Sequence, residues 1–236
     1  FLLQQGGLRP ECVAGHSLGE YSALVAAEVL DFESGLRLVK KRGELMQAAG
    51  DKRPGAMTAI MGLDDQAVLD LCQASTGMVV AANFNAPGQL VISGESEAVK
   101  EVSSAAGEAG AKKVVPLPVS AAFHSPLMEP AALELMKLLD QVPFSSPKIP
   151  VITNVGATAV TNVDELRAQL SAQMTNPVRW TGSMACLRTI GIERAIEVGP
   201  GSVLKGLFRR IDRAVSVSNA ACVDEIEAAK MAASTD

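Results

Sequence analysis

Cysteine, histidine and aromatic residues are scarce in this sequence. Its 236 residues include 4 Cys, 2 His, 1 Trp and 1 Tyr, and aromatic residues make up 3% of the chain. The cysteines lie far apart, and none forms a Cys-x-x-Cys pair of the kind that holds zinc or closes a compact disulfide framework. We therefore expect reduced cysteines and no bound metal.

Long apolar runs and an excess of basic residues are also lacking. No stretch approaches the roughly 20 apolar residues of a membrane-spanning helix, and the start shows no signal pattern. The 26 acidic and 21 basic residues give a net charge of -5, whereas a nucleic-acid binder carries a basic surface. These absences predict a cytoplasmic protein that binds neither membrane nor nucleic acid, and we expect a monomer.

A Gly-x-Ser-x-Gly motif stands at residues 15–19, between an apolar strand end and a helical run. In a nucleophile elbow the serine sits on a tight, strained turn, and we expect Gly15 and Gly19 to leave room for the bend. The motif predicts Ser17 as an exposed nucleophile, with the Leu18 N–H as the first donor to an oxyanion. An ordinary strand-to-helix turn is the alternative interpretation of so short a motif.

A serine nucleophile needs a general base, which is most often histidine. His16 precedes Ser17 directly, and adjacent residues of a strand point to opposite faces, so we expect His16 to be packed and hydrogen-bonded elsewhere. His124 follows a predicted strand and is the predicted base. In α/β-hydrolases the catalytic residues follow one another along the chain as serine, then aspartate or glutamate, then histidine. Here the histidine comes second, and no acidic residue stands out as a third catalytic residue.

The longer motif Gly-His-Ser-Leu-Gly-Glu-Tyr-Ser at residues 15–22 resembles the acyltransferase family that loads malonyl groups from coenzyme A onto acyl carrier protein. Further blocks match in family order along almost the whole chain, at residues 41–47, 55–57, 83–89, 123–128, 176–180 and 197–201. The resemblance implies an acyltransferase of fatty-acid biosynthesis that forms a malonyl-serine intermediate. It implies malonyl-CoA and acyl carrier protein as partners and no bound cofactor.

The resemblance also assigns roles to individual residues. Arg42 pairs with the free carboxylate of the malonyl group, a role that suits its planar, permanently charged fork. Met46 lies one helical turn further on the same side, so the two side chains are expected to line one pocket. A main-chain carbonyl in the Asn-Pro-Val-x-Trp segment, by position that of Arg179, orients His124 in the family.

Three more residues belong to the predicted substrate site. Asn83 and Asn85 resemble family positions near the thioester and the pantetheine chain, although turn formation before residues 87–88 explains them equally well. Phe123 stands next to His124, as in the malonyl-selective members of the family. Its ring is expected to fill the space that the α-methyl group of methylmalonyl would need.

The family chains carry several dozen residues before the point where this sequence begins, including a Gly-Gln-Gly loop that supplies the second oxyanion N–H. We therefore expect an N-terminally truncated chain. Two alternative functions remain open at this stage. One is a serine thioesterase or esterase of the α/β-hydrolase class, which would have no use for Arg42, and the other is an inactive carrier-binding module.

Hydrophobic patterns predict an α/β protein in two parts. Residues 55–117 read as strand, helix, strand, strand, helix, strand, the order of a small ferredoxin-like α+β subdomain. Residues 1–54 and 118–236 alternate strands with helices, which predicts a large α/β-hydrolase-like catalytic subdomain with a parallel sheet. Ser17 is expected at the carboxyl end of a strand, beside an acyl-binding cleft between the two parts.

Helical spacing makes three further predictions. One helix is expected to bury Leu36, Val39, Gly43 and Met46. A helix after residue 128 is expected to turn Leu133, Met136 and Leu139 inward. Basic residues at helical spacing near the end of the chain predict either a docking surface for an acidic carrier protein or a solvated face; they are Lys205, Arg209, Arg210 and Arg213.

Overall fold

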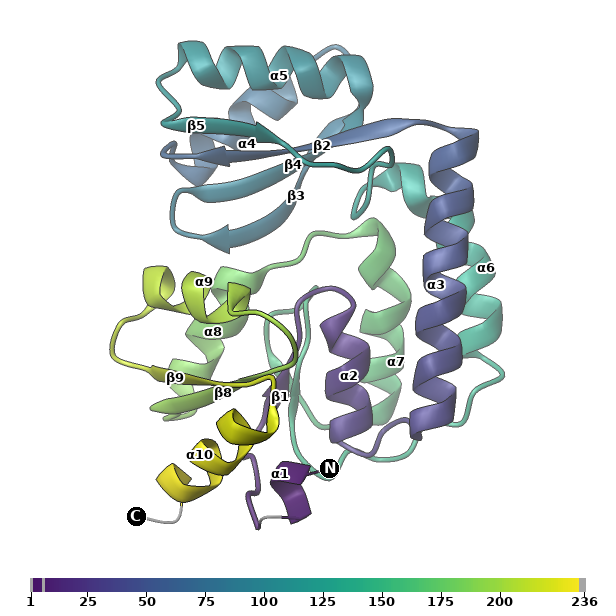
Figure 1. Cartoon of the computed structure of the whole chain (residues 1–236). Coiled ribbons are helices and arrows are strands. Elements are labelled where there is room, and N and C mark those ends of the chain that lie inside the picture. The colour runs from purple at the N-terminus through teal and green to yellow at the C-terminus, as the bar shows by residue number, and fades with distance from the viewer. Residues whose placement is uncertain (1, 6, 234–236) are drawn as a thin grey trace. The chain divides into compact units, whose positions relative to one another are not determined.

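The computed structural model describes residues 2–5 and 7–233, which form both helices and strands along the whole chain (Figure 1). The α/β class is therefore confirmed. The chain forms two compact units: residues 12–183 make up one, and residues 1–11 with 184–236 make up the other. The predicted boundaries at 54/55 and 117/118 do not coincide with this grouping, so an independent subdomain at 55–117 stays a prediction.

A three-stranded sheet forms the centre of the 12–183 unit. Strand β1 (Val13–Ala14) pairs in parallel with β6 (Val151–Ile152), which pairs antiparallel with β7 (Ala159–Val160). The expected all-parallel sheet is wrong here, because a tight turn in which the Thr153 N–H donates to the Thr158 carbonyl reverses the chain. Helices α2 (Gly19–Ala26), α6 (Glu129–Leu139) and α7 (Val163–Ala172) contribute to the hydrophobic core of this region.

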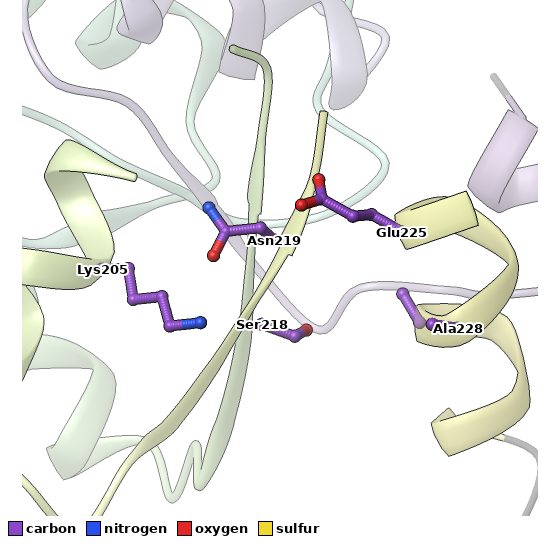
Figure 2. Close-up of a pocket in the computed structure, with 6 residues that line it drawn as sticks. Lys205, Ser218, Asn219, Glu225 and Ala228 are labelled. Atoms are coloured by element: carbon purple, nitrogen blue, oxygen red, sulfur yellow. The ribbon is translucent and has the colours of Figure 1, made fainter. Parts of the chain in front are cut away.

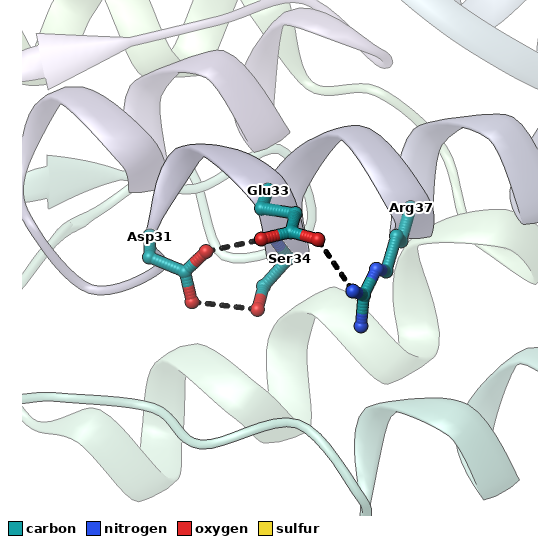
Figure 3. A network of polar contacts seen from close by, with 4 residues as sticks. All are labelled: Asp31, Glu33, Ser34 and Arg37. Atoms are coloured by element: carbon teal, nitrogen blue, oxygen red, sulfur yellow. Dashed lines mark hydrogen bonds and ion pairs between the residues drawn. The ribbon is translucent and has the colours of Figure 1, made fainter.

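The longest helix of this unit, α3 (Phe32–Lys52), begins at a capping aspartate. The Asp31 carboxylate accepts hydrogen bonds from the backbone N–H and the hydroxyl of Ser34, at 2.8 and 2.6 Å. Figure 3 shows this cap beside the ion pair of Glu33 and Arg37, two exposed residues that lie one helical turn apart. The cap satisfies an otherwise unpaired N–H and thereby sets where the helix begins.

The buried face of α3 differs from the predicted one. Leu36 is 58% exposed and Gly43 is exposed, whereas Leu38 and Arg42 are buried together with Met46. The sequence therefore indicated the helix correctly but misplaced its inward face by part of a turn. The consequence is functional, because a charged residue lies on the face that packs into the core.

A four-stranded antiparallel sheet follows in the order β3-β4-β2-β5. Its elements have the predicted connectivity along the chain: β2 (Gly55–Met61), α4 (Asp65–Ala74), β3 (Val79–Ala86), β4 (Gln89–Glu95), α5 (Ser96–Glu108) and β5 (Lys113–Pro116). Ile60 packs with residues of both helices, whereas Met57 and Ala59 pack on the opposite face with Val119 and Phe123. This alternation is that of a strand buried on both faces.

The chain then passes through a short 3-10 helix, η1 (Pro126–Met128), into α6, which lies beside α3 (Figure 1). The buried positions of α6 include Ala131, Leu135 and Leu139. Leu133 and Met136 are 53% and 39% exposed, so their predicted inward orientation is wrong. Small alanines allow close packing here, and hydrophobicity alone did not reveal them as the core face.

The second unit contains a parallel pair, β8 (Arg194–Val198) and β9 (Ser216–Ala220). Its helices are α1 (Leu2–Gln5), α9 (Val203–Ile211) and α10 (Val223–Ala233), together with the end of α8 (Trp180–Thr189). A pocket of about 280 Å³ lies between α9 and α10, and Figure 2 shows Lys205, Asn219 and Glu225 lining it. Across the described residues, no helix combines the length and apolar character needed to cross a membrane.

Candidate active site

Ser17 lies on a strained turn between β1 and α2. Its φ of 51° is in the left-handed region, which is uncommon for a residue with a side chain. A Cβ on Gly15 would lie 2.0 Å from the backbone of Gly19, so Gly15 is required for the bend. A Cβ on Gly19 would meet nothing within 4 Å, so the expectation that both glycines make room is wrong for Gly19.

Asn154, just after β6, holds the elbow from the neighbouring strand. Its side-chain oxygen accepts from the Ser17 N–H at 2.7 Å, and its amide nitrogen donates to the Gly15 carbonyl at 2.7 Å. The amide therefore satisfies the two backbone groups that flank His16, directly before the strained residue. Sequence reasoning missed this residue, although a polar side chain after a parallel strand that adjoins β1 was a usable signal.

The Ser17 hydroxyl lies 2.8 Å from Nε2 of His124, which is buried. The opposite ring nitrogen, Nδ1, lies 3.0 Å from the main-chain carbonyl of Gln173. Because a carbonyl only accepts, Nδ1 carries the proton and Nε2 is free to accept the serine proton. This is the geometry of a nucleophile and its general base.

The carbonyl that orients His124 is therefore that of Gln173, and the predicted assignment to Arg179 is wrong. The Arg179 carbonyl accepts from the N–H of Ser183 at 2.9 Å and from its hydroxyl at 3.2 Å, inside the first turn of α8. Gln173 instead begins a short 3-10 turn, η2 (Gln173–Thr175), directly after α7. Its carbonyl accepts from the Asn176 N–H at 3.4 Å within this turn and also meets Nδ1 of His124, because the chain is extended from Asn176 onward.

Arg42 brings a buried positive charge to the nucleophile. Its guanidinium donates to Ser17 Oγ at 2.8 Å and to the side-chain oxygen of Gln173 at 3.2 Å, and it lies 5.7 Å from the Tyr21 ring centre. Arg42 is only 4% exposed and Met46 is 8% exposed, so both are buried on the same face of α3. Nε of Arg42 is buried and has no partner in the described part of the chain.

Gln173 contributes its side chain as well as its carbonyl. Its amide nitrogen donates to the Ser17 carbonyl at 2.9 Å and to the carboxyl group of Glu20 at 2.6 Å. With its side-chain oxygen on Arg42, this one residue contacts the nucleophile, the base and the cation. Neither Gln173 nor Glu20 was singled out from the sequence, since their partners lie far away along the chain.

The remaining predicted residues occupy the surroundings of the elbow. The His16 ring packs against Trp180 at 5.4 Å between ring centres, and its Nε2 lies 2.8 Å from the Asn85 side-chain oxygen, as a packed and hydrogen-bonded histidine should. Asn85 therefore supports the elbow, and Asn83 is buried beside Val178. Leu18 is 50% exposed, and within the described residues no hydrogen bond occupies its N–H.

Burial and charge make His124 an unusually weak base in the substrate-free protein. Burial lowers the pKa of His124 to about 4, and the positive charge of Arg42 acts in the same direction. The carbonyl of Gln173 opposes this shift by accepting from the ring. The imidazole is consequently neutral at physiological pH, which is the form that can accept the serine proton.

This lowered pKa of His124 predicts that Ser17 keeps its reactivity at mildly acidic pH. Reaction of Ser17 with phenylmethanesulfonyl fluoride should keep its rate from pH 7 to about pH 5 and fall near about pH 4, because only the neutral imidazole accepts a proton. Labelling rates measured by mass spectrometry, with circular dichroism to confirm folding at each pH, would check this. A midpoint near 6.5 would contradict it, since that value belongs to an unperturbed histidine.

A serine on a strained elbow, a histidine within hydrogen-bond distance and an adjacent helix N-terminus are the arrangement expected of an enzyme that uses a serine nucleophile. Over residues 2–232 the chain matches the acyl transferase domain family. The chain belongs to this family, and it is an acyltransferase.

Relatives and solved structures of the same kind cover most of the chain. It is 50% identical over 210 residues to a malonyl CoA-acyl carrier protein transacylase of Escherichia coli, covering 88% of this chain and 68% of the relative. The corresponding Bacillus subtilis protein is 44% identical over 213 residues, covering 89% of this chain and 67% of the relative.

Among solved structures, an acyl carrier protein S-malonyltransferase from Vibrio cholerae superposes with a TM-score of 0.92 at 45% identity, covering 97% of this chain and 76% of that one. A malonyl-transacylase in complex with a type II polyketide acyl-carrier protein also has a TM-score of 0.92, at 41% identity, covering 97% of this chain and 75% of that one.

Proposed function

We propose that the chain transfers a malonyl group from malonyl-CoA to the phosphopantetheine thiol of an acyl carrier protein. The observation that carries this proposal is the buried Arg42 guanidinium, 2.8 Å from the nucleophilic oxygen of Ser17. A neutral acyl chain gains nothing from a buried cation, whereas a malonyl carboxylate pairs with its fork. The position of Arg42 therefore favours malonyl transfer over the esterase and thioesterase alternatives.

The proposed reaction has two steps that both use His124. In the first, Nε2 takes the proton of Ser17, Oγ attacks the thioester carbonyl, and the coenzyme thiolate leaves with the proton returned by His124. In the second, the carrier thiol gives its proton to His124 and attacks the malonyl-serine ester, and Ser17 regains a proton as it leaves. No metal or prosthetic group takes part in either step.

Two groups would act on the bound acyl group. The Leu18 N–H, at the N-cap of α2, would donate to the oxyanion. Arg42 would hold the malonyl carboxylate and position the thioester, and its release from Ser17 Oγ would leave that oxygen free to attack. We further propose that the elements around the elbow have an α/β-hydrolase-like arrangement. We also propose that the protein is a cytoplasmic monomer and that its carrier protein belongs to fatty-acid synthesis.

Direct detection of the intermediate tests this function. The chain incubated with malonyl-CoA should carry one malonyl group on the peptide that contains Ser17, and added holo-acyl carrier protein should remove it as malonyl-carrier protein. Mass spectrometry follows both products. Release of free malonate at the same rate with and without carrier protein would instead indicate a thioesterase.

Phe123 provides a prediction about selectivity. Phe123 is half-buried and packs against two hydrophobic clusters of the core. We expect malonyl to be preferred over methylmalonyl because the ring fills the space that an α-methyl group would need. One methyl group is worth roughly 1–3 kcal/mol, or about 10- to 200-fold. Phe123→Ser should reduce this preference when the two thioesters compete in one reaction. Equal loading by the unmodified protein would contradict the idea.

The basic end of α9 provides a prediction about the carrier. Arg209, Arg210 and Arg213 are exposed, and we expect them to attract an acidic carrier protein. Reversing Arg209 and Arg210 to Glu should raise KM for the carrier protein with strong salt dependence and leave KM for malonyl-CoA unchanged. Steady-state kinetics at two ionic strengths would check this, and an equal rise for malonyl-CoA would mean that the arginines serve its phosphates.

A further inference from the structure

Glu20 lies buried in the first turn of α2, directly after the elbow, and is 1% exposed. Its Oε2 lies 2.6 Å from the side-chain nitrogen of Gln173 and 3.4 Å from the backbone N–H of Asn154. These two residues position the reactive pair, because Asn154 clamps the backbone of Ser17 and Gln173 orients His124. The same carboxyl oxygen of Glu20 therefore accepts hydrogen bonds from both of these residues.

We propose that Glu20 is a positioning residue, which anchors Gln173 and Asn154 through its hydrogen-bond acceptor oxygen rather than through its negative charge. This inference rests on the proposed use of Ser17 as the nucleophile and His124 as its base. It adds a residue whose contribution to the reaction passes entirely through its neighbours.

The local structure around Gln173 explains why an anchor is needed. Gln173 lies in a 3-10 turn of three residues, and Asn176 beyond it is extended. So short a turn has few backbone hydrogen bonds of its own, and the one that the Gln173 carbonyl accepts, from the Asn176 N–H, is long at 3.4 Å. The position of the Gln173 carbonyl therefore depends on its side chain, which uses both amide protons and its oxygen on Ser17, Glu20 and Arg42.

The surroundings of Glu20 favour a carboxyl group that acts as a hydrogen-bond acceptor over one that carries a negative charge. Burial raises the pKa of Glu20 to about 7, although Gln173, Asn154 and the cation Arg42 partly oppose the shift. The charged and titratable groups that face it are Arg42 on α3 and Tyr21 on its own helix. Below neutral pH the carboxyl is thus mainly uncharged, and its oxygen still accepts from Gln173.

Two conservative variants distinguish the position of the acceptor oxygen of residue 20 from the negative charge of its carboxylate. Glu20→Gln keeps an oxygen at the same reach and removes the charge. Glu20→Asp keeps the acid but shortens the side chain by one C–C bond, about 1.5 Å, which takes the oxygen beyond hydrogen-bond distance of Gln173. Glu44→Asp, an exposed position on α3, makes the same chemical change away from the site and serves as the control.

The primary measurement is the labelling rate of Ser17 by phenylmethanesulfonyl fluoride, a neutral reagent that requires only the serine and its base. We expect Glu20→Asp to slow labelling at least tenfold and Glu20→Gln less than threefold, with both folded by circular dichroism. Labelling of Glu20→Asp at the unmodified rate would overturn the proposal, and so would a tenfold loss in Glu20→Gln. If Glu20→Asp does not fold, a tenfold loss in Glu20→Gln alone still overturns the proposal.

Loading by malonyl-CoA supplies the second readout. Because Gln173 also holds Arg42, Glu20→Asp should raise KM for malonyl-CoA in addition to slowing acylation, which a general loss of folded protein would not do. An unchanged KM would overturn the part of the proposal that reaches Arg42. Labelling of the unmodified chain by the sulfonyl fluoride without any malonyl loading would contradict the proposed function and leave the test of Glu20 intact.

Discussion

Replacing His124 with alanine is expected to slow acylation of Ser17 by roughly 10²- to 10⁴-fold, the usual contribution of a positioned general base. His124 Nε2 lies 2.8 Å from the serine oxygen, and in the described residues no other histidine contacts that oxygen. His16 is held by Asn85 and Trp180 and cannot substitute without leaving both. Single-turnover loading with malonyl-CoA, followed by rapid quenching and mass spectrometry, measures the change.

The appropriate control for His124→Ala is the affinity for malonyl-CoA, which isothermal titration calorimetry measures without chemistry. Binding should persist, because Arg42 and its partner Gln173 remain. Acylation within fivefold of the unmodified rate would show that another group takes the serine proton. Loss of binding and acylation together would indicate a damaged fold rather than a missing base.

Replacing Arg42 with alanine is expected to abolish malonyl selectivity. The substitution leaves the substrate carboxylate without a partner in a buried site, at a cost of roughly 3–5 kcal/mol. Since each 1.36 kcal/mol is a factor of ten, malonyl loading should fall by roughly 160- to 5,000-fold. Acetyl loading should persist or rise, because an acetyl group has no carboxylate to pair. Parallel loading assays with malonyl-CoA and acetyl-CoA give the ratio.

Lys41→Ala is the matched control for this prediction. Lys41 is the neighbouring basic residue on α3, but its side chain is exposed and lies 3.8 Å from the carboxylate of Glu44. Its removal should leave the ratio of malonyl to acetyl loading unchanged. Equal losses of both acyl groups in Arg42→Ala would mean that the arginine is structural, and the proposed substrate class would then be wrong.

The sequence by itself determined the parts of this site that depend on local geometry. Gly15 and Ser17 predict the elbow because a strand that turns directly into a helix needs a small residue and a strained one, and the structure has both. Arg42 and Met46 lie four residues apart in a helix, a spacing that places them on one face wherever the helix packs. The alternation of strands and helices likewise predicted most elements.

Only the tertiary structure decided which face of each helix is inward and which groups hold the base. The Gln173 carbonyl meets His124 across 49 residues, and its side chain meets Ser17 across 156 residues, so no local pattern links them. Arg179 was the wrong choice because the first turn of α8 occupies its carbonyl, which a position in a motif does not reveal. Hydrogen bonds between distant segments depend on how the elements pack, and packing is set by the whole chain.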